Sequence, residues 1–141
     1  MMKQFINRYI LLFAWAIALI STVGSLYAGE ILQIPMCIMC WYQRICMYPM
    51  VVILGVSIIR KNTKDILYFV LPFSIVGIIL SFYHHLLQMG VIQETLAPCI
   101  QGISCATKYL FIAGFITFPL ISFIAFSMIT LSVLLFIKTK K

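Results

Sequence analysis

Four long apolar segments constrain the fold of this 141-residue chain more than any other feature. They cover about residues 9–28, 41–59, 66–88 and 110–137. A helix needs roughly 20 apolar residues to cross the hydrocarbon core of a bilayer, and each segment is close to that length or exceeds it. The bilayer interior offers no water to backbone groups, so such segments must be helical. The sequence therefore predicts an all-α membrane protein, a bundle of four transmembrane helices forming a single domain over residues 1–141.

Composition excludes the main alternatives to this class. The chain is 64% hydrophobic and 9% charged, whereas soluble domains carry about 25% charged residues. The net charge of +7 could indicate a nucleic-acid-binding protein, but the basic residues flank the apolar segments, as they do in membrane proteins. We therefore expect contact with membrane lipid and none with nucleic acid. The first apolar segment is longer than the roughly 7–15 residues of a signal-peptide core, so we expect it to be a retained helix.

The basic residues also predict an orientation. Eight of the ten Lys and Arg residues lie before the first apolar segment, between the second and third, or after the fourth. By the positive-inside rule, both termini are then cytoplasmic. The loops at about 29–40 and 89–109 are predicted to face outward.

Two cysteine pairs fall in these outward loops. Cys37 and Cys40 form a Cys-x-x-Cys pair at the start of the second apolar segment, and Cys99 and Cys105 lie in the second loop. A helix N-terminus stabilises a thiolate, and an accessible loop disulfide can exchange with a thiolate of another protein. We interpret both pairs as redox-active. One alternative is that both pairs are structural disulfides in a non-enzymatic scaffold. The other is a four-thiolate zinc site, but an oxidising compartment favours disulfides over such a site, so no metal is expected.

Polar residues inside the apolar segments are further candidates. Arg44 is the only charge near the interior of a predicted span, where charges are usually functional. Its guanidinium could hydrogen-bond a quinone carbonyl or extend to the interface. The adjacent His84 and His85 point about 100° apart on a helix, so at most one faces the bundle. The main alternative to a role at a ligand is an interfacial His bound to backbone or water. A bis-His haem would need a second His on another helix, which the sequence lacks, so only a single-His haem stays open. Cys46 is expected to be a buried small hydrophobe.

The segment Pro35 to Arg44, Pro-x-Cys-x-x-Cys-Trp-Tyr-Gln-Arg, resembles the signature of the DsbB/BdbC family of membrane disulfide-forming oxidoreductases. The likeness covers essentially the whole chain, including the stretch 24–27, His84, and the segment from Pro98 to Cys105. The second outward loop is shorter than in enterobacterial DsbB, so the chain looks like the short BdbC-type members. Vitamin K epoxide reductases are a related alternative, but their loop cysteines precede the helix pair.

The resemblance implies a thiol:quinone oxidoreductase, multi-pass in a bacterial cytoplasmic membrane, with its redox loops outside the cytoplasm. Such a protein reoxidises a thioredoxin-like thiol oxidase of the DsbA/BdbD type and passes the electrons to menaquinone or ubiquinone. Residues matching Arg44 and His84 would lie at the quinone.

The same resemblance implies that the loop pair exchanges with the partner and that the pair of Cys37 and Cys40 faces the quinone. Within the loop pair, we expect the partner's thiolate to attack Cys99 and Cys105 to resolve the mixed disulfide. Electrons would then pass to the disulfide of Cys37 and Cys40. We expect Cys40, nearer Arg44 in the sequence, to be the thiolate that engages the quinone.

Overall fold

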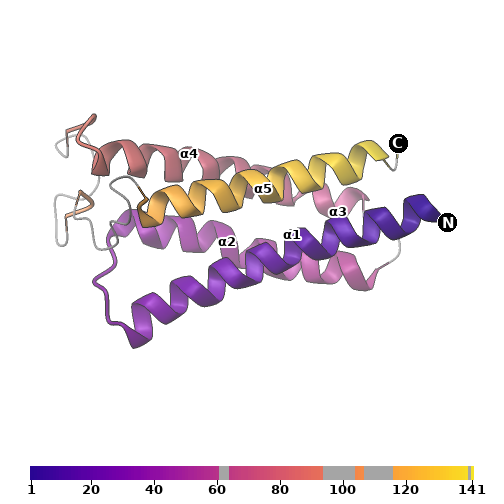
Figure 1. Cartoon of the computed structure of the whole chain (residues 1–141), viewed down its shortest axis with the longest axis horizontal. Helices are drawn as coiled ribbons and strands as arrows, with labels where there is room; N and C mark the ends of the chain where they lie inside the picture. Colours follow the sequence, from indigo (N-terminus) through magenta and orange to yellow (C-terminus); the bar gives the residue numbers. More distant parts are fainter. Residues whose placement is uncertain (61–63, 94–103, 107–115, 140) are drawn as a thin grey trace.

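The computed structural model of the chain describes residues 1–60, 64–93, 104–106, 116–139 and 141, and the regular elements in these ranges are all helical. They are α1 (Met2–Leu26), the π-helical turn η1 (Tyr27–Ile31), α2 (Ile38–Ile59), α3 (Lys64–Tyr68), α4 (Val70–Gln88) and α5 (Phe118–Thr139). Figure 1 shows an elongated bundle with both chain termini at the same end. Four helical segments are long and apolar enough to cross a membrane: α1 with η1, α2, α3 with α4, and α5. The predicted all-α fold with four membrane-crossing helices is confirmed.

A proline explains why the third crossing consists of two helices. Pro72 has no N–H, so the carbonyl of Tyr68, four residues earlier, cannot receive its usual helical hydrogen bond. The helix is interrupted at Phe69, between α3 and α4. Its direction is kept, and together the two pieces still span Lys64–Gln88.

The last helix begins later than the sequence suggests. We expected it over about 110–137, but Thr117 lies outside the helix and α5 starts at Phe118. Pro119 then falls in the first helical turn, where a missing N–H costs little because that group has no helical partner. Residues 110–115 of the expected helix lie outside the described residues.

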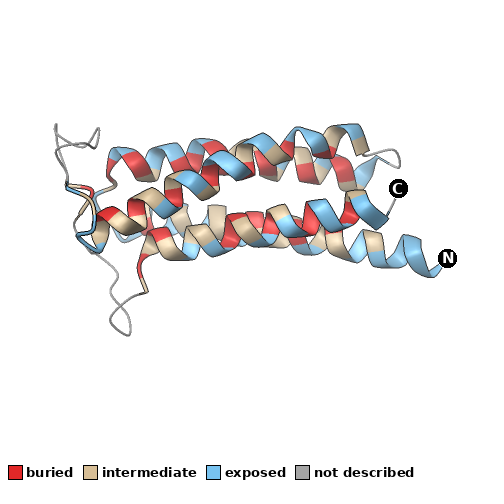
Figure 2. Ribbon diagram, turned by 90° about the horizontal axis from the view of Figure 1, so that it is seen from above, coloured by how far each residue is buried: buried red, intermediate tan, exposed pale blue. Residues whose placement is uncertain are grey.

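The four crossings form a ring in which α1 packs on α2 and α5, and α4 packs on the same two helices. In the ribbon of Figure 2, buried residues alternate with exposed ones along each helix. The exposed residues of the helices include many large apolar ones. This arrangement is stable only where the surroundings are apolar, as in lipid. At Gly77 on α4, the ring of Phe126 on α5 packs so close that an added Cβ would overlap it.

Candidate redox site

The Cys-x-x-Cys pair lies where α2 begins, at the end of the bundle away from both termini (Figure 1). Cys37 is the N-cap residue of α2, with an extended backbone, and Cys40 lies in the first turn. The backbone N–H of Cys40 bonds the carbonyl of Cys37 at 3.1 Å. Both cysteines are free thiols, and their sulfurs are 3.3 Å apart. The structure therefore presents this pair as a reduced dithiol at a helix N-terminus.

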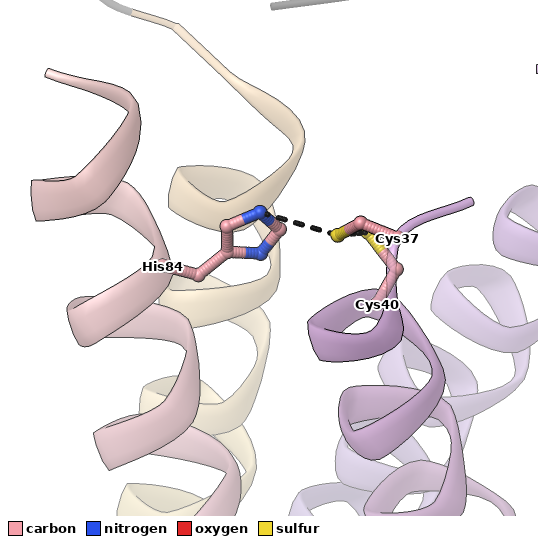
Figure 3. A group of neighbouring side chains, drawn as sticks. All are labelled: Cys37, Cys40 and His84. Atoms are coloured by element: carbon pink, nitrogen blue, oxygen red, sulfur yellow. Dashed lines mark hydrogen bonds between the residues drawn. The ribbon is translucent and has the colours of Figure 1, made fainter. Parts of the chain in front are cut away.

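His84 on α4 points at this dithiol (Figure 3). Its Nε2 atom is 3.6 Å from the Cys37 sulfur and 3.2 Å from the carbonyl oxygen of Cys105. On the other side of the ring, the side-chain nitrogen of Gln43 is 3.1 Å from Nδ1. An amide nitrogen can only donate, so Nδ1 accepts and the proton of the neutral imidazole sits on Nε2. His84 thereby donates towards the sulfur of Cys37 and contacts the backbone carbonyl of Cys105, a cysteine of the second loop.

Three donors stabilise the thiolate of Cys37. The thiol of Cys40 lowers the pKa of Cys37 most, His84 lowers it further, and the backbone N–H of Cys40 adds to both effects. Burial opposes these hydrogen bonds because it disfavours the charged form. The hydrogen bonds outweigh the burial, and the pKa of Cys37 is lowered to about 4. The sequence placed the thiolate at Cys40, but here the hydrogen bonds converge on Cys37.

Arg44 is buried between α1 and α2 and only 4% exposed. Its Nε donates to the hydroxyl of Ser25 at 2.8 Å, and a terminal nitrogen donates to the backbone carbonyl of the same residue. The guanidinium carbon also lies 5.3 Å from the centroid of the Trp41 ring, within cation–π range. The sequence left open whether the guanidinium acts inside the bundle or extends to the membrane interface. These contacts favour a position inside the bundle.

The turn η1 makes room for that guanidinium. A Cβ on Gly29 would lie 2.6 Å from a terminal nitrogen of Arg44, closer than side-chain atoms approach one another. A larger residue here would fit only if the guanidinium of Arg44 moved, so the constraint at Gly29 comes from contact rather than from backbone angle. Short π-helical turns often occur at functional sites.

A cavity of about 340 Å³ opens beside these groups. Its walls are mainly apolar, from α1, α2 and the start of α5, with a few polar side chains, as is usual for small-molecule sites. The polar and sulfur-bearing residues that line it include Ser25, Cys37, Cys40, Gln43, Arg44, His84 and Cys105. The cavity therefore brings Cys37 and Cys40 together with Arg44 and His84.

Comparison with known proteins identifies the family at this point. Residues 7–137 match the family model described as disulfide bond formation protein DsbB. The chain belongs to the DsbB family. It is 42% identical to disulfide bond formation protein C of Bacillus subtilis (strain 168), over 87% of this chain and 89% of the relative. It is also 38% identical to probable disulfide formation protein C 2 of Bacillus anthracis, over 96% and 94% of the two chains.

A similar protein also occurs outside the genus Bacillus. The probable disulfide formation protein of Chlamydia pneumoniae is 39% identical, over 99% of this chain and 98% of the relative. No solved structure shows significant similarity to the chain. Membership in the DsbB family confirms the resemblance stated from the sequence and makes the chain a disulfide-forming membrane protein.

The other residues singled out in the sequence lie in different surroundings. Cys105 is buried and disulfide-bonded, whereas the prediction for Cys99 lies outside the described residues. Cys46 is a buried free thiol in the apolar core, as expected. Of the two histidines, His84 faces the bundle, and His85 turns to the hydroxyl of Thr117, 3.0 Å from its Nδ1.

Two residues of the site were not recognised from the sequence. Gln43 orients His84, and Ser25 anchors Arg44. Each lies within a stretch that resembles the family, and this resemblance could have pointed to them. They were missed because neither is charged and neither pairs with a neighbour along its own helix. Only the packing of α1 and α4 against α2 reveals their partners.

Proposed function

We propose that this chain is a thiol:quinone oxidoreductase of a bacterial cytoplasmic membrane. It would reoxidise an extracytoplasmic thiol oxidase of the DsbA/BdbD type and pass two electrons to a membrane quinone. The observation that carries the proposal is the opening of the Cys37–Cys40 dithiol onto an apolar cavity that also holds buried Arg44 and His84. A structural disulfide in a scaffold needs neither a lining of this kind nor a stabilised thiolate.

Electrons enter through the second outward loop in this proposal. The partner's thiolate bonds the sulfur of Cys99 and displaces that of Cys105, and the partner's second thiol then frees Cys99. The partner leaves as a disulfide, and the loop pair is left as a dithiol. A thiolate of this dithiol then attacks the disulfide of Cys37 and Cys40, so two electrons move to the helix pair and the loop disulfide forms again.

Cys37 is suited to be the sulfur that carries negative charge after this exchange. His84 and Cys40 both direct protons at it, and a better-stabilised thiolate leaves faster in thiol–disulfide exchange. The contact between His84 and the carbonyl of Cys105 keeps the segment that carries the loop thiol against the same imidazole. These contacts favour exchange between the pairs at Cys37.

The cavity fits a quinone head group in size and character. A flat, mainly apolar ring with two carbonyl oxygens needs apolar walls and a few donors, which the guanidinium of Arg44 and the imidazole of His84 can supply. When bound, the quinone would accept the two electrons and two protons that leave the dithiol as it becomes a disulfide. Arg44 would then stabilise negative charge developing on a carbonyl oxygen.

A reconstituted assay tests the proposal. Purified chain in lipid is mixed with a reduced DsbA-type protein and either a ubiquinone or a menaquinone analogue, and loss of thiols is measured together with quinone reduction. We expect one quinone reduced for each disulfide formed, no reduction with Cys37→Ser, and parental rates with Cys46→Ser, which changes a thiol in the core. Cysteines that do not change redox state during the assay would instead indicate a structural scaffold.

A further inference from the structure

Three metal-binding side chains meet at the start of α2. The sulfurs of Cys37 and Cys40 and a ring nitrogen of His84 all lie within 4.8 Å of one another. Figure 3 shows the imidazole extending from its own helix to the two sulfurs. The carbonyl oxygen of Cys105 lies close to the same ring, 3.2 Å from Nε2 of His84. The cluster itself offers two sulfurs and one nitrogen.

Two of the three ligand spacings are close to those of a tetrahedral site, and the third, between Cys40 and His84, is within 4.8 Å. With bonds of about 2.3 Å to sulfur and about 2.0–2.1 Å to nitrogen, a tetrahedral ion holds its S and N ligands about 3.6 Å apart and its two S ligands about 3.8 Å apart. The Cys37 sulfur and Nε2 of His84 are already 3.6 Å apart. The two sulfurs, 3.3 Å apart, need to separate by only about half an ångström to reach the tetrahedral spacing.

The donor types indicate the kind of ion. Thiolate and imidazole together favour ions such as Zn²⁺ and Cd²⁺ over Mg²⁺ or Ca²⁺, which take oxygen ligands. Two thiolates cancel the charge of a divalent cation, so the complex is neutral, as a mainly apolar cavity requires. The positive charge of Arg44 lines the same cavity, but its guanidinium is directed to Ser25.

Gln43 can support such a site. A ligating His commonly donates its other ring N–H to an oxygen, which fixes the ring and strengthens the ligand. If the side-chain amide of Gln43 rotates so that its oxygen and nitrogen exchange places, the oxygen takes the position 3.1 Å from Nδ1. Nδ1 then carries the proton, and Nε2 presents its lone pair to the two sulfurs.

We propose that the reduced Cys37–Cys40 pair and His84 form a binding site for a thiophilic divalent cation such as Zn²⁺, and that the bound cation holds the pair in its dithiol state. The cation replaces the thiol protons and no electron moves. A disulfide offers no thiolate, so the oxidised pair does not bind it. By linkage, a ligand that binds only the reduced form stabilises that form against oxidation. Given the proposed function, such a cation would act as an inhibitor.

The binding test uses the whole chain in lipid, with Cys99→Ser and Cys105→Ser to remove the loop thiols while keeping the backbone carbonyl of residue 105. Co²⁺ alone is titrated into the reduced and the oxidised protein. We expect the ligand-field and sulfur-to-cobalt bands of a tetrahedral thiolate site only in the reduced protein, and their loss when Zn²⁺ is added. Binding of Co²⁺ by the oxidised protein, or none by the reduced protein, would overturn the proposal.

A matched pair of variants identifies the nitrogen ligand. His84→Ala should weaken Co²⁺ binding at least tenfold, and Gln43→Leu, which removes the support of a ligand, by about 10–100-fold. His85→Ala is the control, because that ring bonds Thr117 and lies outside the cluster. Equal binding by His84→Ala and His85→Ala would exclude His84 as a ligand.

A second measurement needs no change at His84 and is independent of the proposed function. In the same Cys99→Ser, Cys105→Ser protein, Zn²⁺ should protect Cys37 and Cys40 from alkylation and slow their oxidation by diamide at least tenfold, and a chelator should restore both rates. Neither readout uses a quinone or a partner protein, so the cation site and the proposed activity can fail separately. Unchanged oxidation in saturating Zn²⁺ would refute the claim that the cation holds the pair reduced.

Discussion

The guanidinium of Arg44 on α2 binds both the hydroxyl and the backbone carbonyl of Ser25 on α1. Both acceptors are neutral oxygens, so this pairing holds a buried cation in place without itself cancelling the positive charge. A buried charge next to an apolar cavity is costly for stability, and such residues in membranes usually serve a function. The arrangement suits a group that must stabilise negative charge developing on a bound molecule.

Substituting Arg44 tests that role. Arg44→Lys keeps the charge but loses the planar fork, so it should be partly active, and Arg44→Met should be worse. We expect the apparent KM for the quinone to rise by roughly tenfold or more, since a hydrogen bond from a charged group contributes about 1.5–3 kcal/mol. Capture of the partner protein, which involves the outward loop, should be preserved. Quinone kinetics equal to those of the parent, measured per folded molecule, would mean that Arg44 only anchors the helix.

Two glycines provide a matched test of the space around the same guanidinium. Gly29→Ala adds a Cβ that would lie 2.6 Å from Arg44, whereas Gly24→Ala adds one with no atom within 4 Å. We expect Gly29→Ala to displace Arg44 and raise the KM for the quinone several-fold. Gly24 lines the same cavity, so Gly24→Ala, which displaces no atom, reports the effect of an added methyl group alone. We expect it to change the KM less than Gly29→Ala does and to raise stability by about 0.5–1 kcal/mol, because alanine loses less entropy in a helix. Equal kinetics of the two variants would show that the guanidinium can move away without consequence.

The sequence predicted most of this architecture, because the length of an apolar segment and the spacing of cysteines are local properties. The four crossings and the position of Cys37 at a helix start follow from them. The pairing of Arg44 with Ser25 does not, because it joins two helices whose relative rotation depends on packing along their whole length. For the same reason periodicity showed that only one of His84 and His85 could face the bundle, but not which one.

Gln43 should control the reactivity of Cys37 through His84. Gln43→Leu removes the donor to Nδ1, so the proton of the imidazole is no longer fixed on Nε2 and the thiolate loses a reliable donor. We expect alkylation of Cys37 at pH 6 to slow by several-fold in the reduced protein, measured by mass spectrometry of the labelled peptide. Gln43→Glu is the companion variant, since a carboxylate favours the doubly protonated ring, which still donates from Nε2. If both variants react like the parent, His84 does not depend on Gln43.

The pH dependence of Cys37 gives a further prediction. Its pKa of about 4 lies below that of an ordinary thiol, which is about 8.5 in an unfolded chain. The thiolate therefore stabilises the folded, reduced protein fully above the unfolded pKa, and this contribution is lost as the pH falls through about 4. We expect alkylation of Cys37 to remain near its maximum rate at pH 6 and to decline towards pH 4. A decline centred near pH 8 would show that the thiol is not perturbed.

Orientation in the membrane is the last prediction, since the structure places both termini at one end of the bundle and the start of α2 at the other. Single cysteines in a background without the native ones can report on each end. Val91, which follows α4, is 71% exposed, and Lys141 at the C-terminus is exposed as well.

A maleimide that cannot cross membranes should label Val91→Cys on intact cells, whereas Lys141→Cys should react only after the membrane is permeabilised. The physical reason is the concentration of Lys and Arg at the terminal end, which the positive-inside rule assigns to the cytoplasm. Similar rates for both variants in permeabilised cells would verify that accessibility, rather than reactivity, separates them. Labelling of Lys141→Cys alone on intact cells would invert the orientation and place the cysteine pairs in a reducing compartment, where a disulfide-forming relay could not be maintained.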